Sequence, residues 1–316
     1  MDIPEFMKCP DSNEFQKQLI EFIPDIVIFH GVFYKQIRKY SQILRTQNIP
    51  YIFEPHGAYS FKNYKKSQLK KLLFWNLYFK KALFNSKGLI FLNENERQNF
   101  AIDFKNLSSY IVPNGSYENQ DFRLSNVKGN ESVTFLYLSR IDINHKGLDI
   151  LMEAIRLLEK DGELNNVCFK FYGPGHESDL RIFKGLIANM PENISYYGPI
   201  YGDEKDSVIR NADIFILTSR YEGFPMSILE ALSYGCPCLV SKGTNVAEII
   251  EDFDAGWVVE SLNPIAVADM IKTAIKDYSK KYDSLRKNAK CASEEYLWDK
   301  IAKKSIEVYL KVLNDK

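Results

Sequence analysis

The chain has 316 residues, of which 45% are hydrophobic and 26% are charged, a composition typical of a globular protein and not of a disordered or fibrous one. Its 41 Lys and Arg residues balance 41 Asp and Glu residues, so the overall charge gives no indication of a nucleic-acid partner. This length suits two domains of ordinary size or one large domain.

The cysteines and the apolar segments indicate where the protein works. The five cysteines show no disulfide-framework spacing, which favours reduced thiols in the cytosol. Cys236 and Cys238 are expected to be small residues entering a buried strand, not a redox pair. The sequence has neither a long apolar segment nor signal-peptide features at its start, so we expect a cytoplasmic protein.

Strands alternate with helices in the first part of the chain. The expected strands are 24–29, 50–53, 88–92 and 109–113, and the expected helices are 13–22, 33–47, 65–85 and 94–104. This alternation predicts a parallel sheet in a doubly wound domain. A polar stretch from 114 to 132 interrupts the pattern and is expected to be a linker.

The alternation resumes after the linker and predicts a second doubly wound domain. The expected strands are 133–138, 167–172, 194–197, 212–218 and 238–241. The expected helices are 147–159, 177–189, 203–211, 225–234, 245–251, 264–278 and 294–313. Asn245 and Glu248 have the spacing of a capping box for the helix at 245–251.

The stretch Ser219–Gly235 joins a buried strand to a helix. Pro225 suits the first helical turn and Gly235 suits the position after the helix. The loop therefore lies at the carboxyl end of a parallel strand, where open α/β sheets bind ligands. Backbone N–H groups of 223–227 and the helix dipole would favour an anion there.

Two glutamates flank this anion site. Glu222 lies in the loop, and Glu230 lies one turn into an otherwise apolar helix, where a carboxylate needs a partner. The spacing suits a diphosphate between two polyhydroxyl groups, because carboxylates accept hydrogen bonds from hydroxyl pairs. A nucleotide sugar fits this description. The plainer alternative is a solvated Glu222 and a locally paired Glu230.

Further candidates follow other expected strands. Arg140 and Lys146 precede a helix and could stabilise a leaving nucleoside diphosphate, although loop cations are usually just solvated. Gly173 lies in a glycine turn that could be only a turn. His56 and His30 each follow a strand and could line a cleft, or be structural hydrogen-bonding groups.

Asp252-Phe253-Asp254 has the Asp-x-Asp pattern that some glycosyltransferases use to bind a divalent metal. Because it follows an expected helix and not a strand, we interpret it as a turn and expect no metal and no cofactor.

The stretch Arg-Tyr-Glu-Gly-Phe-Pro-Met-Ser-Ile-Leu-Glu-Ala resembles the E-x7-E signature of family-4 retaining glycosyltransferases of the GT-B fold. The resemblance implies that Glu222, with Gly223, Phe224, Pro225 and Met226, contacts the transferred sugar, and that Glu230 holds the ribose. Arg140 and Lys146 match an R-x5-K-G segment that neutralises the donor diphosphate. His56 matches a P-H-G segment near the sugar, and we expect Glu222 and His56 to be the catalytic residues. Ile200 matches a base-contacting segment, and Gly173 is assigned to the donor site.

The implied architecture is two Rossmann-like domains whose parallel sheets face across a cleft. We expect an acceptor-side domain at 1–117, a linker at 118–132, a nucleotide-sugar domain at 133–293 and a helix at 294–316 that crosses back to the first domain. Compared with the family pattern, a third or more of the first domain is missing, which would leave a strand at an exposed edge.

The resemblance implies a metal-independent retaining glycosyltransferase that moves a hexose-type sugar from a nucleotide-diphosphate donor to a glycan or lipid-linked glycan, in capsule, exopolysaccharide or lipopolysaccharide biosynthesis. One alternative is a non-catalytic subunit whose incomplete first domain binds a partner enzyme. Another is a nucleotide-sugar epimerase of similar fold.

The segment 62–87 contains eight lysines and no acidic residue, interleaved with apolar side chains. Such a segment suits an anionic membrane surface. A core helix with a lysine-rich edge is the alternative. Family members that act on lipid-linked acceptors often bind the membrane through their first domain. The resemblance therefore favours a peripheral contact of this segment with the inner face of the plasma membrane.

Overall fold

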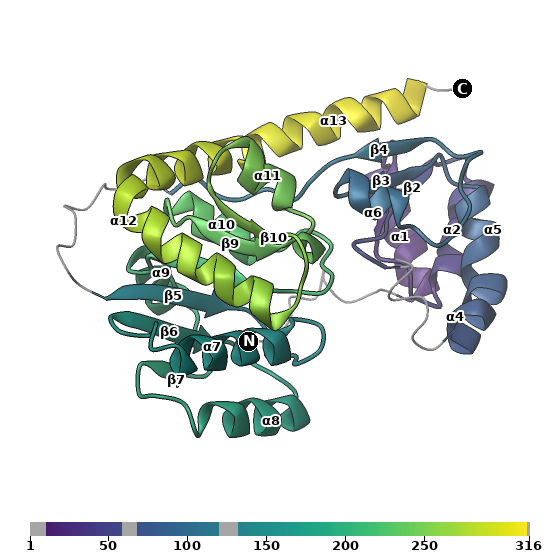
Figure 1. Ribbon diagram of the computed structural model, residues 1–316. Helices are drawn as coiled ribbons and strands as arrows, with labels where there is room; N and C mark the ends of the chain where they lie inside the picture. The colour runs from purple at the N-terminus through teal and green to yellow at the C-terminus, as the bar shows by residue number, and fades with distance from the viewer. Residues whose placement is uncertain (1–10, 59–67, 120–131, 315–316) are drawn as a thin grey trace. The chain divides into compact units, whose positions relative to one another are not determined.

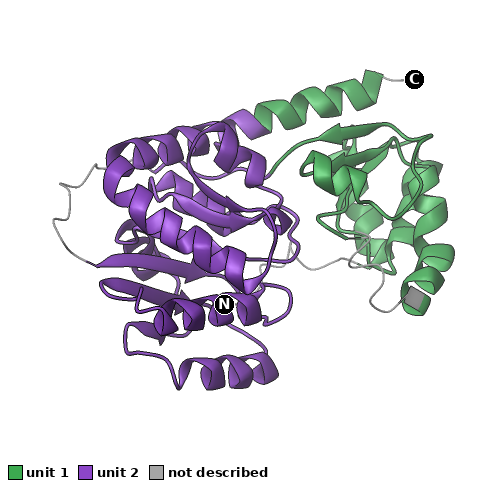
Figure 2. Cartoon of the chain, viewed as in Figure 1, with its two compact units in different colours: residues 1–113, 302–316 green, residues 114–301 purple. Residues whose placement is uncertain are grey.

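The computed structural model of the protein describes residues 11–58, 68–119 and 132–314 (Figure 1). The chain forms two compact units, residues 1–113 with 302–316, and residues 114–301 (Figure 2). Each unit contains one parallel β-sheet. The expected α/β class with two parallel sheets is therefore confirmed.

The first unit contains a sheet in the order β1-β2-β3-β4, with every neighbouring pair parallel. Its strands are β1 (Val27–His30), β2 (Tyr51–Glu54), β3 (Leu89–Phe91) and β4 (Ser109–Ile111). Its helices include α1 (Ser12–Phe22), α2 (Ile37–Thr46), α4 (Gln68–Phe74), α5 (Lys80–Phe84) and α6 (Glu94–Gln98). Among the described residues β1 pairs only with β2, so it forms an edge of the sheet.

Aromatic side chains fill the core of the first unit. Phe53 on β2 and Phe91 on β3 are fully buried, and the Phe79 ring packs edge-on against Phe53 at 5.0 Å between centroids. Burial of such side chains contributes about 1.5–3 kcal/mol each. Strand β2 is buried along its whole length, as the apolar run predicted.

The expected helix at 65–85 is confirmed from residue 68 onward, with one irregular turn. Between α4 and α5 lies a π-helix, η2 (Trp75–Phe79), in which the Lys80 N–H bonds the carbonyl of Trp75, five residues earlier. Residues 59–67 lie outside the described part of the chain. Two other helices are shorter than predicted: α2 begins at Ile37, and α6 ends at Gln98.

The second unit contains a sheet in the order β10-β9-β8-β5-β6-β7, again all parallel. Its strands are β5 (Val133–Leu138), β6 (Val167–Tyr172), β7 (Ile194–Tyr196), β8 (Ile214–Leu217), β9 (Cys238–Ser241) and β10 (Gly256–Val259). The helices between them are α7 (Leu148–Lys160), α8 (Glu177–Ile187), α9 (Gly202–Arg210), α10 (Met226–Ser233) and α11 (Ala247–Asp252).

The two cysteines that follow α10 are buried, as predicted for the entry to a strand. Both Cys236 and Cys238 are free thiols with no exposed surface. The Asp252–Asp254 segment is the turn that the sequence predicted, since α11 ends at Asp252 and Asp254 has φ 48°.

The last part of the chain is more helical than expected. Helix α12 (Pro264–Glu294) continues well beyond the predicted end at 278 and contains a non-helical residue, Lys281, with φ −117°. Its Lys272 pairs with Asp161 beyond α7, and its Arg286 donates to the Tyr234 carbonyl beyond α10, so tertiary contacts hold both halves. Helix α13 (Trp298–Asn314) follows, and residues 302–316 belong to the first unit.

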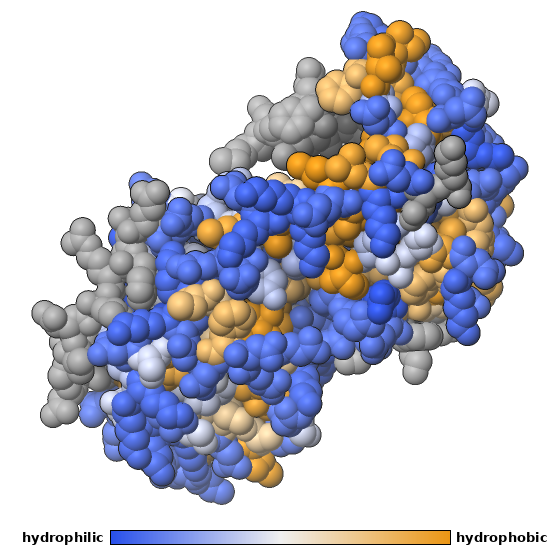
Figure 3. Space-filling model, turned by 90° about the horizontal axis from the view of Figure 1, so that it is seen from above, coloured by the Kyte–Doolittle hydropathy of each residue, from blue (hydrophilic) through white to orange (hydrophobic). Residues whose placement is uncertain are grey.

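Surface hydrophobic residues are distributed in several patches, which hydrophilic residues separate on the face drawn in Figure 3. Among residues 11–58, 68–119 and 132–314, no helix is both long and apolar enough to cross a membrane.

Candidate functional site

The strand order places a topological switch point between β5 and β8 in the second unit. Strands β6 and β7 lie on one side of β5, whereas β8, β9 and β10 lie on the other. Connections that leave β5 and β8 therefore diverge, and the crevice between them at the carboxyl ends is where such sheets bind ligands. The loop after β5 carries Arg140 and Lys146, and the loop after β8 carries Glu222.

Glu222 is a nearly buried carboxylate that both loops hold in place. Its Oε1 accepts hydrogen bonds from Lys146 Nζ at 2.6 Å and from Ser219 Oγ at 2.6 Å. The side chains of Lys146 and Glu222 are 9% and 11% exposed. At this burial each charge needs the other, because an unpaired charge in the interior is costly. The predicted donor residues Lys146 and Glu222 are therefore in direct contact.

Three further contacts fix the backbone around Glu222. Asn245 donates from its side-chain amide to the Glu222 carbonyl at 2.6 Å. Arg220 forms a two-pronged pair with Asp149 at 2.7 and 2.6 Å. His145 stacks on Tyr221 at 4.2 Å between ring centroids, and burial lowers the pKa of its imidazole. The loop is thus tied to the segments that follow β5 and β9.

The capping box expected at Asn245 and Glu248 is wrong. Asn245 has φ 60°, and its side chain binds the Glu222 loop instead of the helix, while Val246 occupies the N-cap of α11 without a side-chain bond. A tertiary contact has replaced the local one.

Helix α10 begins and ends within one residue of the predicted bounds, with Pro225 at the N-cap and not in the first turn. Pro225 precedes the first helical residue, Met226, and no side chain caps this helix start. At the other end, Gly235 has φ 65°, and bonds from Gly235 to Leu232 and from Cys236 to Ala231 form a Schellman motif. The start of α10 follows the Glu222 loop directly, so its dipole favours negative charge there.

Glu230 has the partner that its place in an apolar helix required. Lys205 Nζ, from α9, lies 3.0 Å from Glu230 Oε1, with 34% of the glutamate side chain exposed. Both residues, together with Met226 and Arg210, line a cavity of about 690 Å³ within the second unit. This volume is in the range of small-molecule sites.

The remaining donor-site candidates lie around the same edge of the sheet. The Arg140 side chain is 58% exposed and lies 3.4 Å from Asp142 and 3.2 Å from His145 Nδ1. Gly173 has φ 144°, and a Cβ on it would lie 1.9 Å from the Ser139 carbonyl, so only glycine fits beside the loop after β5. Ile200 is half-buried after β7.

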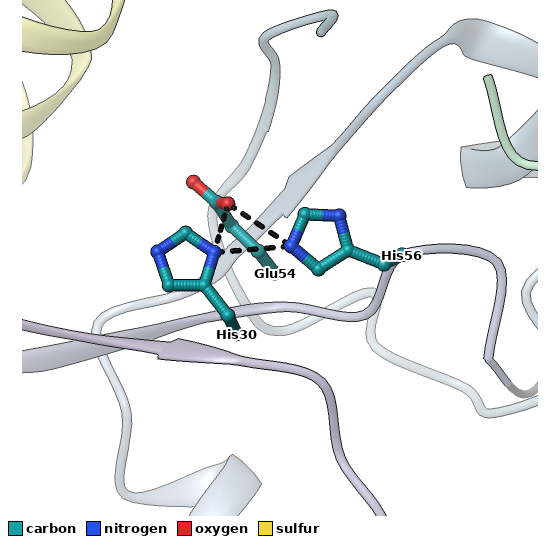
Figure 4. A group of neighbouring side chains, drawn as sticks. All are labelled: His30, Glu54 and His56. Atoms are coloured by element: carbon teal, nitrogen blue, oxygen red, sulfur yellow. Dashed lines mark hydrogen bonds and ion pairs between the residues drawn. The ribbon is translucent and has the colours of Figure 1, made fainter. Parts of the chain in front are cut away.

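A second group of polar side chains lies in the first unit, at the carboxyl ends of β1 and β2 (Figure 4). His30 Nδ1 lies 2.9 Å from Glu54 Oε2 and 3.0 Å from His56 Nε2, and His56 Nε2 lies 3.5 Å from Glu54 Oε2. The hydrogen bond to Glu54 raises the pKa of His30, whereas burial lowers the pKa of His56. The two candidate histidines are therefore neighbours, and Glu54 joins them.

Glu96 supports the loop that carries His56. It is 4% exposed, and its carboxylate accepts hydrogen bonds from the N–H groups of Gly57 at 2.5 Å and Leu92 at 2.7 Å. Burial raises the pKa of Glu96 although both hydrogen bonds act in the opposite direction. The loop that carries His56 is thereby fixed to the start of α6.

Sequence reasoning missed five side chains that complete these groups: Glu54, Glu96, Lys205, Ser219 and, in its actual role, Asn245. Ser219 and Glu54 lie at strand ends, close in sequence to the predicted residues Glu222 and His56. This position could have identified them as candidates. Lys205 and Glu96 lie on helices, and nothing in their local sequence distinguishes them from solvated surface residues.

The two parallel α/β sheets have the fold of GT-B glycosyltransferase structures. Residues 118–291 match the family model for glycosyl transferases group 1. The chain therefore belongs to the glycosyl transferases group 1 family.

Individual relatives support the same class. An uncharacterized glycosyltransferase of Methanocaldococcus jannaschii is 27% identical over 192 residues, which are 61% of this chain and 48% of that protein. A second from that organism is 24% identical over 331 residues, 95% of this chain and 86% of the relative. An uncharacterized protein of the cps region of Klebsiella pneumoniae is 24% identical over 229 residues. The match covers 69% of this chain and 59% of that protein. This chain thus spans about half the length of the first relative.

The solved structures show the same fold. HepE of Anabaena, crystallised with UDP and glucose, has a TM-score of 0.75 and 17% identity, and the match covers 95% of this chain and 81% of HepE.

Proposed function

We propose that the protein is a retaining glycosyltransferase that moves a hexose-type sugar from a nucleoside-diphosphate donor to a glycan or lipid-linked glycan. The observation that carries this proposal is the Glu222–Lys146 pair at the switch point, directly before the start of α10. A buried carboxylate, a buried cation and a helix N-terminus are side by side, and this combination suits a sugar joined to a diphosphate.

In this proposal the donor occupies the carboxyl edge of the second sheet. Glu222 and the backbone of 223–226 hold the sugar, Arg140 and Lys146 hold the diphosphate, and Glu230 holds the ribose in the adjoining cavity. Gly173 and the segment containing Ile200 flank the base. Lys146 would shift from Glu222 alone to a position shared with the diphosphate.

The reaction breaks the bond between the anomeric carbon and the diphosphate oxygen, and the electron pair leaves with the nucleoside diphosphate. An acceptor hydroxyl oxygen bonds to the same face of the anomeric carbon, and its proton passes to the departing diphosphate oxygen. Negative charge grows on the diphosphate, and Arg140, Lys146 and the α10 N-terminus stabilise it without a metal at the diphosphate.

The acceptor class is supported by two observations. One relative lies in a cps region, which fits surface-polysaccharide biosynthesis. In addition, Leu69, Leu72, Leu73 and Leu77 are 45–82% exposed at the spacing of one helical stripe along α4 and η2. The exposed Lys70, Lys80 and Lys81 lie in the same segment, which suits the anionic inner face of a membrane.

Vesicle co-sedimentation tests this surface. Leu73→Glu should weaken binding to vesicles of anionic phospholipid, whereas Ile182→Glu, at an exposed position on α8, should not. Equal binding by both variants and the unchanged protein would contradict the membrane proposal.

The edge position of β1 favours a second candidate, a subunit that pairs this strand with a partner enzyme. Near β1, Phe22 and Ile23 at the end of α1 are 83% and 80% exposed. Size-exclusion chromatography with the products of neighbouring genes would reveal such a partner. Sugar transfer by the isolated chain would exclude the non-catalytic role.

Thermal unfolding with UDP, GDP or ADP, each with and without magnesium, tests the donor site. One nucleotide at about 100 times its dissociation constant should add about 2.7 kcal/mol of stability without magnesium. Glu230→Ala should lose this shift, Glu222→Gln should retain it and abolish transfer, and Glu204→Ala, on the exposed side of α9, should change neither. Equal losses in the Glu222 and Glu230 variants would refute the assigned roles.

A further inference from the structure

We propose that His30, Glu54 and His56 bind a divalent transition-metal ion, with Zn²⁺ as the ion that suits them best. This inference concerns the first unit and does not depend on the transferase proposal. It replaces the expectation, drawn from the sequence, that the protein binds no metal.

Strand register brings the first two ligands together. His30 is the last residue of β1 and Glu54 the last residue of β2, and the two are paired in the parallel register. His56 follows two residues later, and its ring lies beside that of His30, with centroids 5.3 Å apart. Figure 4 shows the three side chains converging from two strand ends and one loop.

The distances fit one ion. The three facing atoms, Nδ1 of His30, Oε2 of Glu54 and Nε2 of His56, are 2.9, 3.0 and 3.5 Å apart. A circle through them has a radius of about 1.8 Å, less than the Zn–N and Zn–O bond lengths of about 2.0–2.1 Å. A point about 0.9 Å out of their plane therefore lies at bonding distance from all three.

A single hydrogen bond from His30 cannot join all three atoms. A neutral imidazole carries one N–H, so a proton on His30 Nδ1 points well toward Glu54 or toward His56 but not toward both. A cation at the centre interacts with both ring nitrogens and with the carboxylate at once.

The loop holds His56 in place before any ion binds. His56 and Gly57 have φ 51° and 77°, and the Ala58 N–H bonds the Pro55 carbonyl, which closes a tight turn. The Gly57 N–H bonds the buried Glu96 carboxylate. Left-handed backbone is costly for a residue with a side chain and marks sites where geometry is imposed.

Charge and access also suit an ion. Glu54 faces both imidazoles and supplies an oxygen ligand of the kind that a divalent cation accepts. The Glu54 side chain is 12% exposed, whereas those of His56 and His30 are 37% and 63% exposed. Two histidines and one carboxylate form a set found in zinc enzymes, where a further position stays open to water or substrate. Here the open position would accept water or a hydroxyl oxygen.

The experiment is metal binding by the full chain after removal of its affinity tag and bound metals. Calorimetric titration with Zn²⁺ should show one site per chain. Because loss of a residue that only supports a ligand already costs about 10–100-fold in affinity, His30→Gln and Glu54→Gln should each weaken binding by about 100-fold or more. His176→Gln, an exposed histidine at the start of α8, is the matched control and should bind as the unchanged protein does.

Co²⁺ spectroscopy on the unchanged protein provides a reading that does not depend on how the variants fold. Visible bands of nitrogen and oxygen coordination, without a thiolate charge-transfer band, are expected. The absence of Zn²⁺ binding, a thiolate band, or full binding by folded His30→Gln and Glu54→Gln variants would overturn the proposal, leaving a hydrogen-bonded trio.

Discussion

Glu222 is held in its nearly buried position by its own loop and by a second, distant loop. Ser219 is local, but Lys146 lies 76 residues earlier in the sequence. The pair is therefore a tertiary feature, and its energy depends on both charges remaining together.

Removing the cation should expose this dependence. Lys146→Met leaves the Glu222 carboxylate buried without its partner and should lower the free energy of unfolding by about 3 kcal/mol. Adding Glu222→Gln removes the stranded charge and should restore much of the loss. Denaturant unfolding of the single and double variants measures both effects, and additive losses would contradict a coupled pair.

The Asp149–Arg220 pair predicts a pH dependence. Burial acts to raise the pKa of Asp149, but the Arg220 guanidinium outweighs it, so the pKa is lowered. The folded protein thus favours the carboxylate, and this stabilisation is present above the ordinary pKa of about 4 and lost as the pH falls through the lowered value.

This interpretation can be tested by measuring the free energy of unfolding between about pH 6 and about pH 3. This range spans the ordinary carboxyl pKa of about 4. Asp149→Asn should start less stable and lose less stability on acidification than the unchanged protein. Glu177→Gln, which removes an exposed pair on α8, should follow the unchanged protein. Parallel curves for Asp149→Asn and the unchanged protein would contradict the lowered pKa.

At the scale of elements, α7 begins where the loops after β5 and β8 pack against each other. Gly147, its N-cap, has φ 64°, and a Cβ there would lie 2.1 Å from the Thr218 carbonyl. Glycine therefore permits both the helix start and the close approach of the two loops.

Gly162 provides a matched control, because it has φ 73° and nothing within 4 Å of an added Cβ. Gly162→Ala should cost about 1–2 kcal/mol for the left-handed backbone alone. Gly147→Ala should cost more, because Thr218 must move, and it should also weaken nucleotide binding. Thermal unfolding and nucleotide titration of both variants measure the difference. Equal losses of stability in the Gly147→Ala and Gly162→Ala variants would show that the close approach of Gly147 to Thr218 does not matter.

Helix boundaries show where local sequence is sufficient. Pro225 and Gly235 set the ends of α10 through their own backbone preferences, so the predicted bounds were correct to within one residue. Asn245 was predicted wrongly because its amide binds the distant Glu222 carbonyl. The extension of α12 beyond 278 was missed for a similar reason, since Arg286 is held by a contact with the Tyr234 carbonyl.

For the whole molecule, the two sites lie in separate units, so their ligands should protect separate segments. A nucleoside diphosphate should slow amide exchange in the loops after β5 and β8, and Zn²⁺ should slow it at 54–58. At about 100 times the dissociation constant, exchange that requires ligand release should slow about 100-fold. Hydrogen-exchange mass spectrometry measures both; nucleotide protection confined to the first unit would contradict the donor site.

The sequence by itself predicted nine of the ten strands that the structure describes, their parallel arrangement and the positions of Glu222 and Glu230, because apolar runs, Pro225 and Gly235 act through short-range chemistry. It also placed His30 and His56 at strand ends, but it missed β10 at Gly256–Val259. Only the tertiary structure decided that Lys146 pairs with Glu222, that Lys205 pairs with Glu230 and that Glu54 joins the two histidines. These contacts join residues far apart in the chain, and strand order and register, which local preferences do not encode, bring them together.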